Sequence, residues 1–205
     1  MHRKIISTNF VVLRKTPYLE SSLIISGISP EHGKIDFLIK GGRRISKKNS
    51  PEVDLFRVFN IEYAEKSSSI FSPVMMEYVR DFDRIAYYPD KLAELMTMTG
   101  FILRNTHYGI SCSSVYLTLI NYLERVIQKR AFSIMYIKFA YLHENGLLND
   151  DLTLFIEDVL RSRKVIGQLL QDIRGEKVID FDISKEYLSK VEQRVDSLCL
   201  ANHIL

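Results

Sequence analysis

The chain has 205 residues, of which 46% are hydrophobic and 26% are charged, and its formal net charge is +3. This composition is ordinary for a folded soluble protein. No apolar run reaches the ~18 residues of a membrane-spanning helix, and the first residues lack the apolar core of a cleavable signal, so we expect a cytoplasmic protein.

The charge is unevenly distributed along the chain. Residues 1–50 contain ten Lys and Arg against three Asp and Glu, a net charge of +7, whereas the remainder carries −4. A basic N-terminal part on a slightly acidic body is typical of a phosphate-binding module joined to a second domain.

The first part of the chain reads as strands. Residues 5–13 are rich in β-branched side chains, and we expect this strand to end before Pro17. Four further candidate strands follow, at residues 22–28, 35–39, 53–63 and 69–76. Five short strands with glycine at the corners and no helix between them predict a small OB-like β barrel over residues 1–79.

From residue 80 onward the apolar residues recur with a helical period, which predicts an all-α domain over residues 80–205 and an α+β protein overall. Helices are expected near residues 91–103, 116–127, 132–142, 149–173 and 184–198. The second has a stripe of Tyr116, Leu119, Ile120, Leu123, Val126 and Ile127. Asn145-Gly146 is expected to end the third helix as a left-handed cap.

The most informative stretch is residues 33–48, GKIDFLIKGGRRISKK. A strand runs into Lys40-Gly41-Gly42-Arg43-Arg44, and Lys47 and Lys48 follow, so five cations occur within nine residues without an acid. Such a run needs an external anion, and a nucleic-acid phosphate chain is the commonest polyanion that fits. The alternative is a solvated surface loop.

Catalytic and metal-binding patterns are absent from the sequence. The segment from Gly27 to Lys34 has the wrong glycine spacing for a phosphate-binding loop, and His143-Glu144 lacks the second histidine of a zinc-protease helix. Cys112 and Cys199 cannot form a four-cysteine zinc site, and we expect them to be reduced thiols. We therefore expect no enzyme activity, no cofactor and no metal.

The front half of the chain resembles the bacterial recombination mediator family RecO. The likeness lies in Val11-Val12-Leu13-Arg14, in Glu20-Ser21 before an apolar strand, in His32-Gly33-Lys34 and most strongly in Lys40-Gly41-Gly42-Arg43-Arg44. The resemblance implies an N-terminal OB fold, a C-terminal helical domain and a non-enzymatic role in recombinational DNA repair, close to the nucleoid.

The resemblance also implies partners. Proteins of this family bind single- and double-stranded DNA, anneal complementary strands, bind the acidic tail of the single-stranded DNA-binding protein and, with RecR, help load RecA. Many members carry a four-cysteine zinc module in the helical domain. This chain has only His143 to Asp150 at that place, so the zinc module is missing from its sequence.

The residues that we expect to bind DNA lie in the basic N-terminal part of the chain. The expected phosphate contacts are Arg14, Lys34, Lys40, Arg43, Arg44, Lys47 and Lys48. Tyr18 and Phe37 are candidates for base stacking, with barrel core as the alternative for both. Arg125, Lys129 and Arg130 are the candidates for an acidic peptide, with a solvated helix face as the alternative. The competing hypothesis for the whole chain is an OB-fold adaptor for protein or RNA with a helical interaction domain.

Overall fold

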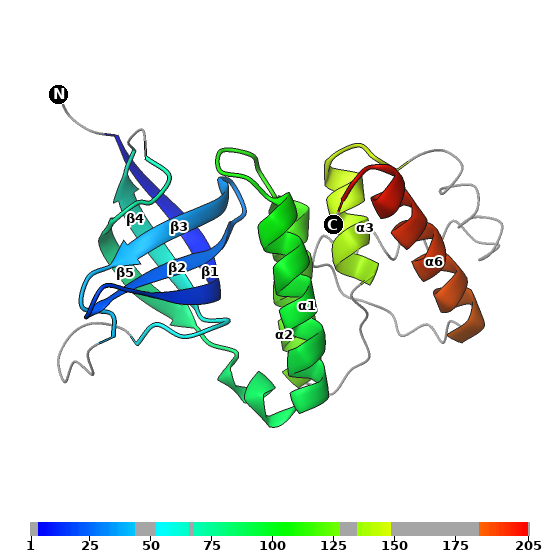
Figure 1. Cartoon of the computed structure of the whole chain (residues 1–205), viewed down its shortest axis with the longest axis horizontal. Helices are drawn as coiled ribbons and strands as arrows, with labels where there is room; N and C mark the ends of the chain where they lie inside the picture. Colours follow the sequence, from blue (N-terminus) through cyan, green and yellow to red (C-terminus); the bar gives the residue numbers. More distant parts are fainter. Residues whose placement is uncertain (1–3, 44–51, 66–67, 128–134, 149–184, 205) are drawn as a thin grey trace. The chain divides into compact units, whose positions relative to one another are not determined.

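The structure is a computed structural model of the chain, and it describes residues 4–43, 52–65, 68–127, 135–148 and 185–204 (Figure 1). The chain divides into two compact units, Met1–Ser113 and Ser114–Leu205. The first unit contains a β-sheet, a short 3₁₀ helix and helix α1. The second contains the remaining helices.

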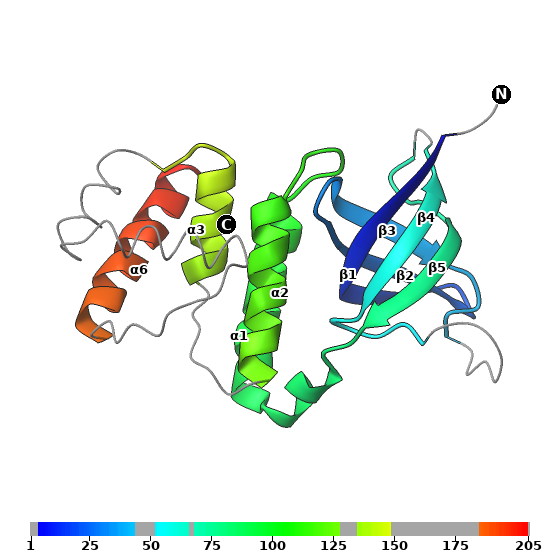
Figure 2. The same cartoon turned by 180° about the vertical axis from the view of Figure 1, so that it is seen from behind.

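The sheet of the first unit is antiparallel throughout, and its strands lie in the order β3-β2-β1-β4-β5. Figures 1 and 2 show its two faces, with the long β1 between β2 and β4. The strands are β1 Ile5–Tyr18, β2 Ser22–Ser29, β3 Gly33–Ile39, β4 Val58–Ala64 and β5 Pro73–Arg80. Five strands followed by helices, as the sequence predicts, give an OB-like fold with a helical part.

The sheet is not a closed barrel, because no ladder joins β3 to β5 among the described residues. Near this gap Phe71, two residues before β5, forms a parallel bridge with Phe37 of β3. There the N–H of Leu38 donates to the carbonyl of Phe71 (2.8 Å), and the N–H of Phe71 donates to that of Asp36 (2.9 Å). The sheet is therefore open and curved instead of a closed barrel, and hydrogen bonds between β3 and the segment at Phe71 link its two edges.

Alternate side chains of the strands point into one core, which is the reason the sheet curves. Phe10, Phe37 and Phe59 are completely buried, and the ring of Phe37 packs edge-on against Phe10 and Tyr63 at 5.1 and 5.3 Å. Apolar side chains from all five strands or their flanks join this cluster, which is built from Ile6, Phe10, Val12, Leu23, Ile25, Ile35, Phe37, Phe59, Ile61, Tyr63 and Phe71, with Met76 of β5 packed against it. Burial of these side chains is the main stabilisation of the sheet.

Three strands have bounds that differ clearly from the prediction. One is β5, which is Pro73–Arg80 instead of residues 69–76. Strand β1 continues through Pro17 to Tyr18, and Pro17 pairs with Leu23 of β2. The proline is tolerated because β1 pairs with β4 only as far as Val11, so no strand of the described residues lies on its far side to need its N–H. Strand β4 begins at Val58, five residues later than the sequence pattern suggests.

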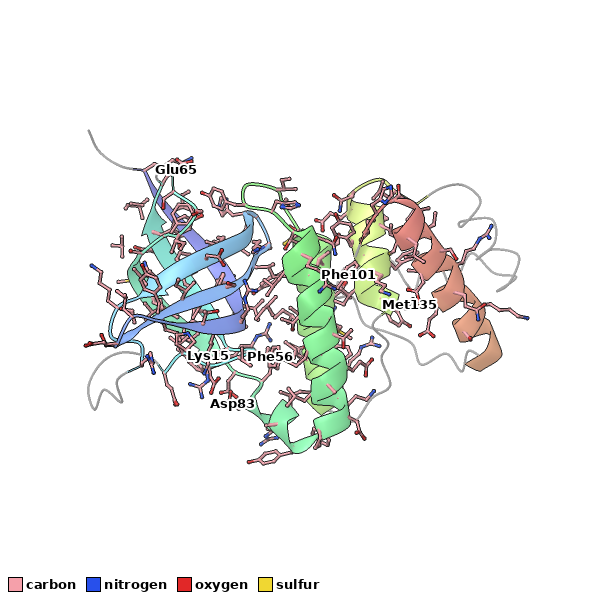
Figure 3. All side chains as sticks on the ribbon, viewed as in Figure 1. Lys15, Phe56, Glu65, Asp83, Phe101 and Met135 are labelled. Atoms are coloured by element: carbon pink, nitrogen blue, oxygen red, sulfur yellow. The ribbon has the colours of Figure 1, made fainter. Side chains whose placement is uncertain are left out.

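A 3₁₀ helix, η1 (Asp83–Tyr87), and helix α1 (Pro89–Asn105) follow the sheet, and α1 contacts β1 and β2. This contact covers the face of those strands that points away from the inner cluster, where Val11, Leu13 and Ile28 are fully buried. In Figure 3, Lys15 and Asp83 lie at the end of the sheet where β5 passes into η1.

The loop after α1 returns to the turn between β2 and β3. The N–H of Cys112 donates to the carbonyl of Pro30 (2.9 Å), and that of Gly109 donates to the carbonyl of His32 (2.9 Å). Gly33 takes a positive φ of 66°, and a side chain there would lie 2.2 Å from the carbonyl oxygen of His107. The loop and the turn therefore fit closely only with glycine at this position.

The second unit contains α2 (Ser113–Ile127), α3 (Met135–Glu144) and α6 (Lys185–Ala201). Helix α3 packs against α6, and Lys138 forms an ion pair with Asp196 (2.6 Å). Gly146 has φ 67°, and the N–H of Leu147 donates to the carbonyl of Leu142, which confirms the predicted cap.

Four of the expected helices correspond to the described helices α1, α2, α3 and α6. The stripe of α2 is buried at Leu119, Leu123 and Val126. Val191 and Val195 of α6 are buried as well. The helix expected at residues 149–173 lies outside the described residues.

The proposed division into domains at residues 79 and 80 stays a prediction. The change from strands to helices occurs after Arg80, where β5 ends. The first compact unit instead extends to Ser113, because α1 and the loop after it pack on the sheet.

Candidate nucleic-acid interface

The candidate cations Arg14 and Lys34 lie on the face of the sheet opposite the inner cluster. Arg14 of β1 is level with Ser26 of β2, which is level with Asp36 of β3. The guanidinium of Arg14 is exposed, and one nitrogen donates to the hydroxyl of Ser26 at 3.4 Å. Lys34 lies two residues before Asp36, on the same face of β3.

Asp36 lies in one row across the sheet with Arg14 and Ser26, and the sequence analysis did not include it in the site. One of its carboxylate oxygens is buried and has no hydrogen-bond partner among the described residues. It lies about 10 Å from Arg14, two strand spacings across the sheet. The outer face of β1, β2 and β3 is therefore mixed in charge rather than purely cationic.

Lys40 and Arg43 lie in the turn that follows β3. Gly41 has φ 71°, and the N–H of Gly42 donates to the carbonyl of Ile39 (3.3 Å). The glycines turn the chain sharply, so the side chains of Lys40 and Arg43 leave the same short turn, and both are exposed.

Arg43 binds the protein's own backbone. Its Nη1 donates to the carbonyl oxygens of Leu19 (3.1 Å) and Glu20 (3.3 Å), at the tip of the β1–β2 hairpin. Its backbone N–H donates to the carbonyl of Ser21 (3.0 Å). This link between Arg43 and the hairpin has no signal in the sequence, because the two segments are more than twenty residues apart.

The structure brings together only some of the expected phosphate contacts. Lys40 and Arg43 share a turn, whereas Lys34 lies about 20 Å from Lys40 along β3. Arg14 lies on the outer face, closer to Lys34 than to the turn. The remaining candidates, Arg44, Lys47 and Lys48, lie outside the described residues.

The two aromatic candidates differ in exposure. Phe37 is completely buried in the inner cluster, so the core alternative is correct and it cannot stack on a base. Tyr18 is 43% exposed at the end of β1, and the neighbouring Leu19 is 75% exposed. Tyr18 is therefore available for contact with a base.

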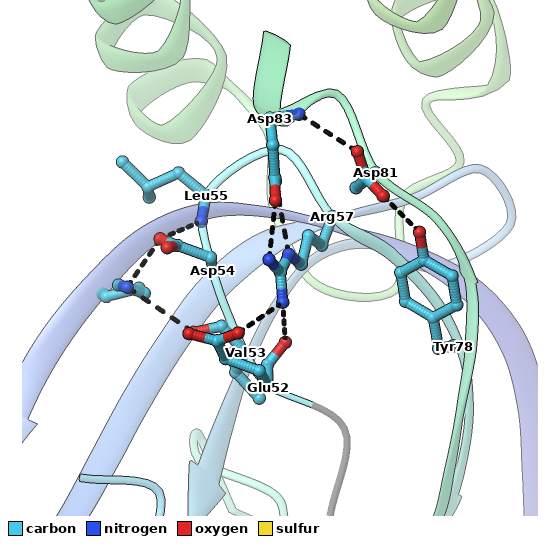
Figure 4. A network of polar contacts seen from close by, with 9 residues as sticks. Glu52, Val53, Asp54, Leu55, Arg57, Tyr78, Asp81 and Asp83 are labelled. Carbon is cyan, nitrogen blue, oxygen red and sulfur yellow. Dashed lines mark hydrogen bonds and ion pairs between the residues drawn. The ribbon is translucent and has the colours of Figure 1, made fainter. Parts of the chain in front are cut away.

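Two other cations of the first unit, Lys15 and Arg57, are paired with acids, and Figure 4 shows the pair of Arg57 with Asp83. The ammonium of Lys15 lies 2.6 Å from a carboxylate oxygen of Asp54. The guanidinium of Arg57 donates to both oxygens of Asp83, and a nitrogen donates to the carbonyl of Glu52 (2.7 Å).

These contacts alter the ionisation of their members. The hydrogen bond to Asp83 raises the pKa of Arg57 despite its burial. Burial alone would raise the pKa of Asp54, but hydrogen bonds from Lys15 and from the backbone of Leu55 outweigh it, so the net shift is downward. Carboxylates of the protein neutralise these two cations, so we do not expect them to bind a phosphate.

A tyrosine–aspartate contact continues this polar region. The hydroxyl of Tyr78 donates to a carboxylate oxygen of Asp81, which lowers the pKa of Asp81 and raises that of Tyr78. The contact joins the last residues of β5 to the segment that leads into η1 (Figure 4).

In the helical part, Arg125 lies in α2, beside the buried stripe, and is half-buried. Lys129 and Arg130 lie outside the described residues. The proposed groove for an acidic peptide thus has one described member and stays a prediction.

Among the described residues, no group of three or more His, Cys, Asp or Glu side chains could hold a metal ion. Both cysteines are buried and carry free thiols. None of the described helices combines the length and apolarity that crossing a membrane requires.

Comparison with known proteins finds a family model that matches most of the sheet. Residues 1–73 match the family model described as Recombination protein O N terminal. The match covers β1 to β4 and the basic turn, including Arg14, Lys34, Lys40 and Arg43. No curated protein matches the chain. Over residues 1–73 the chain is therefore similar to the N-terminal domain of recombination protein O.

Proposed function

We propose that the chain is a non-enzymatic recombination mediator that binds single- and double-stranded DNA, promotes annealing of complementary strands and supports RecA loading during repair in the cytoplasm, at the nucleoid. The observation that carries this proposal is the turn after β3, where the exposed Lys40 precedes the basic run at residues 44–48, inside the segment that matches the RecO N-terminal model.

The mechanism is electrostatic. Complementary strands repel one another along their phosphates, and a protein that neutralises several phosphates releases counterions and lowers this barrier. Lys40 carries no described ion pair with an acid, unlike Lys15 and Arg57, so its charge is available to a phosphate. The cations at residues 44, 47 and 48 extend the same run in the sequence.

The proposed partners are those that the resemblance to RecO implies. We propose RecR, the acidic tail of the single-stranded DNA-binding protein and, indirectly, RecA. Arg125, with Lys129 and Arg130, is the proposed contact for the acidic tail. A titration of the chain with an acidic peptide ending in an aromatic residue, before and after all three cations are changed to Ala, tests this contact.

The test of DNA binding is the salt dependence of affinity. With four phosphate contacts on a single strand, the slope of log affinity against log salt should be near −3, at ~0.7 per contact. Lys40→Ala should reduce the slope by about 0.7 and slow the annealing of complementary oligonucleotides. Arg84→Ala, which removes an exposed cation from η1, is the matched control and should leave the slope unchanged.

The same measurement separates the competing hypothesis. A chain that binds RNA in strong preference to DNA would be an RNA-binding OB module. A chain that binds neither nucleic acid at low salt would be a protein adaptor, and the mediator proposal would be wrong.

A further inference from the structure

The tip of the β1–β2 hairpin has an unusual backbone and unusual exposure. Leu19, the first residue after β1, has a positive φ of 53° and is 75% exposed. Positive φ is disfavoured for a leucine, and an exposed leucine gains no burial in return. Tyr18, directly before it, is 43% exposed. The fold therefore presents two adjacent apolar side chains to solvent in a conformation that needs support.

Arg43 supplies that support. Its Nη1 donates to the carbonyls of Leu19 and Glu20, and its backbone N–H donates to the carbonyl of Ser21. These three acceptors are all of the residues between β1 and β2. Arg43 thus holds the whole tip through its backbone, and its guanidinium is directed to the hairpin.

The basic turn is fixed to the same place. A side chain at Gly42 would lie 3.0 Å from Ile39 and 3.1 Å from Leu23, so the turn packs closely against the start of β2. Lys40 belongs to this turn and is exposed. A cation for phosphates and an apolar pair are therefore parts of one local structure.

We propose that Tyr18 and Leu19 form a base-contacting tip, which stacks on or enters between the bases of a single DNA strand while Lys40 contacts the phosphates. Arg43 is a positioning residue that holds this tip and makes no phosphate contact of its own. The inference rests on the proposed DNA-binding function and deepens it. Apolar side chains that enter base steps and aromatic rings that stack on bases are common in proteins that bind nucleic acids.

The difference between a base contact and a phosphate contact is measurable. A lost phosphate contact reduces the salt slope, whereas a lost stacking contact weakens binding equally at every salt concentration. The affinity of the full chain for a fluorescein-labelled oligo(dT) is therefore measured across a salt series. A second oligonucleotide carries 2-aminopurine, whose fluorescence rises when a base leaves its stack.

The first variant is Tyr18→Ala/Leu19→Gly. Glycine takes positive φ without strain, so the hairpin keeps its conformation and the protein should stay folded. We expect the affinity to fall about tenfold at every salt concentration with an unchanged slope, and the 2-aminopurine signal to disappear. Tyr87→Ala, which removes a tyrosine that is 80% exposed on η1, is the control and should behave as wild type.

The second variant, Arg43→Ala, tests the positioning role. We expect it to weaken binding and reduce the 2-aminopurine signal with an unchanged salt slope, and Arg43→Lys to restore part of both, because lysine can still donate to a carbonyl. A slope reduced by about 0.7 with an intact 2-aminopurine signal would make Arg43 a phosphate contact and overturn this assignment.

The measurements distinguish a failure of the proposed DNA binding from a failure of the proposed base-contacting tip. If wild type binds neither oligonucleotide, the proposed function is wrong. If wild type binds with the expected slope, but the tip variant binds equally well and leaves the 2-aminopurine signal unchanged, the base-contacting tip is wrong and DNA binding stands.

Discussion

Arg57 and Asp83 form a two-pronged ion pair between the residue before β4 and the first residue of η1. Nη2 of Arg57 lies 2.6 Å from one carboxylate oxygen of Asp83, and Nε lies 3.3 Å from the other. The arginine side chain is only 15% exposed, and it also donates to the carbonyl of Glu52. This pair connects the sheet to the helix that follows it.

We expect Arg57→Ala to lower the free energy of unfolding by about 1–3 kcal/mol, because charged hydrogen bonds are lost and the carbonyl of Glu52 loses its donor. Urea unfolding followed by circular dichroism measures the change. Arg84→Ala, on η1 itself, should change the stability by less than about 0.5 kcal/mol. Equal stability of the two variants would show that the pair contributes nothing to the fold.

The second prediction concerns the extent of the first folding unit. A fragment of residues 1–113 should fold by itself, because it retains α1 and the loop that binds the β2–β3 turn. A fragment of residues 1–79 exposes Val11, Leu13 and Ile28 on the outer face of the sheet, and it should aggregate or unfold at lower urea. Proton NMR dispersion and urea midpoints compare the two. A well-dispersed 1–79 fragment of equal stability would contradict this expectation.

The third prediction isolates the contact at Gly33. Gly33→Ala places a Cβ 2.2 and 2.3 Å from the carbonyl oxygens of His107 and Ile110, at a positive φ. We expect a loss of at least about 2 kcal/mol in unfolding free energy, because either the backbone is strained or the loop must move.

Gly41→Ala is the matched control for Gly33→Ala. Gly41 has a similar φ of 71°, but no atom of the described residues lies within 4 Å of its added Cβ. Its variant should lose only the cost of the left-handed conformation, about 1 kcal/mol. A loss as large as that of Gly33→Ala would mean that the loop does not contribute.

The fourth prediction is a pH dependence from Asp54. Its pKa is lowered from the ordinary 3.8, since the hydrogen bonds from Lys15 and Leu55 outweigh the effect of burial. A carboxyl whose folded pKa is lower than its unfolded pKa stabilises the fold above the unfolded value, and this contribution is lost as the pH falls through the folded value.

Asp54→Asn should therefore destabilise the protein near pH 7 and have progressively less effect as the pH falls below 3.8. The effect at neutral pH should be below about 1 kcal/mol, because the Asp54 side chain is 46% exposed and solvent screens the pair. Urea midpoints of wild type and variant at pH 7, 5, 4 and 3 give the comparison. A difference that grows on acidification would contradict the assignment.

The fifth prediction concerns the acid between the outer-face cations. If a single strand passes near Arg14 or Lys34, Asp36→Asn should raise the affinity for oligo(dT) by about two- to fivefold at low salt, since the aspartate repels phosphates near these cations. Glu62→Gln, on the outer face of β4, is the control. An equal change in both variants would indicate a general effect of net charge, and no change in either would place the DNA elsewhere.

Local sequence determined much of this protein. The β-branched runs gave β2 and β3 nearly to the residue, and the helical stripe of Leu119, Leu123 and Val126 is buried as its spacing predicts. The cap at Gly146 also follows from neighbouring residues. These features depend on contacts within a strand, a helix turn or a loop, which a short stretch of chain already contains.

Tertiary structure alone decided the rest. Pro17 can continue β1 because, in the described part of the chain, only β2 lies beside it. Arg43 reaches the carbonyl of Leu19 because β3 ends beside the hairpin tip. Asp36 enters the row of Arg14 through two strand pairings. Each relationship joins residues far apart in the chain, so it depends on which strands are neighbours and in what register, and no single segment contains that information.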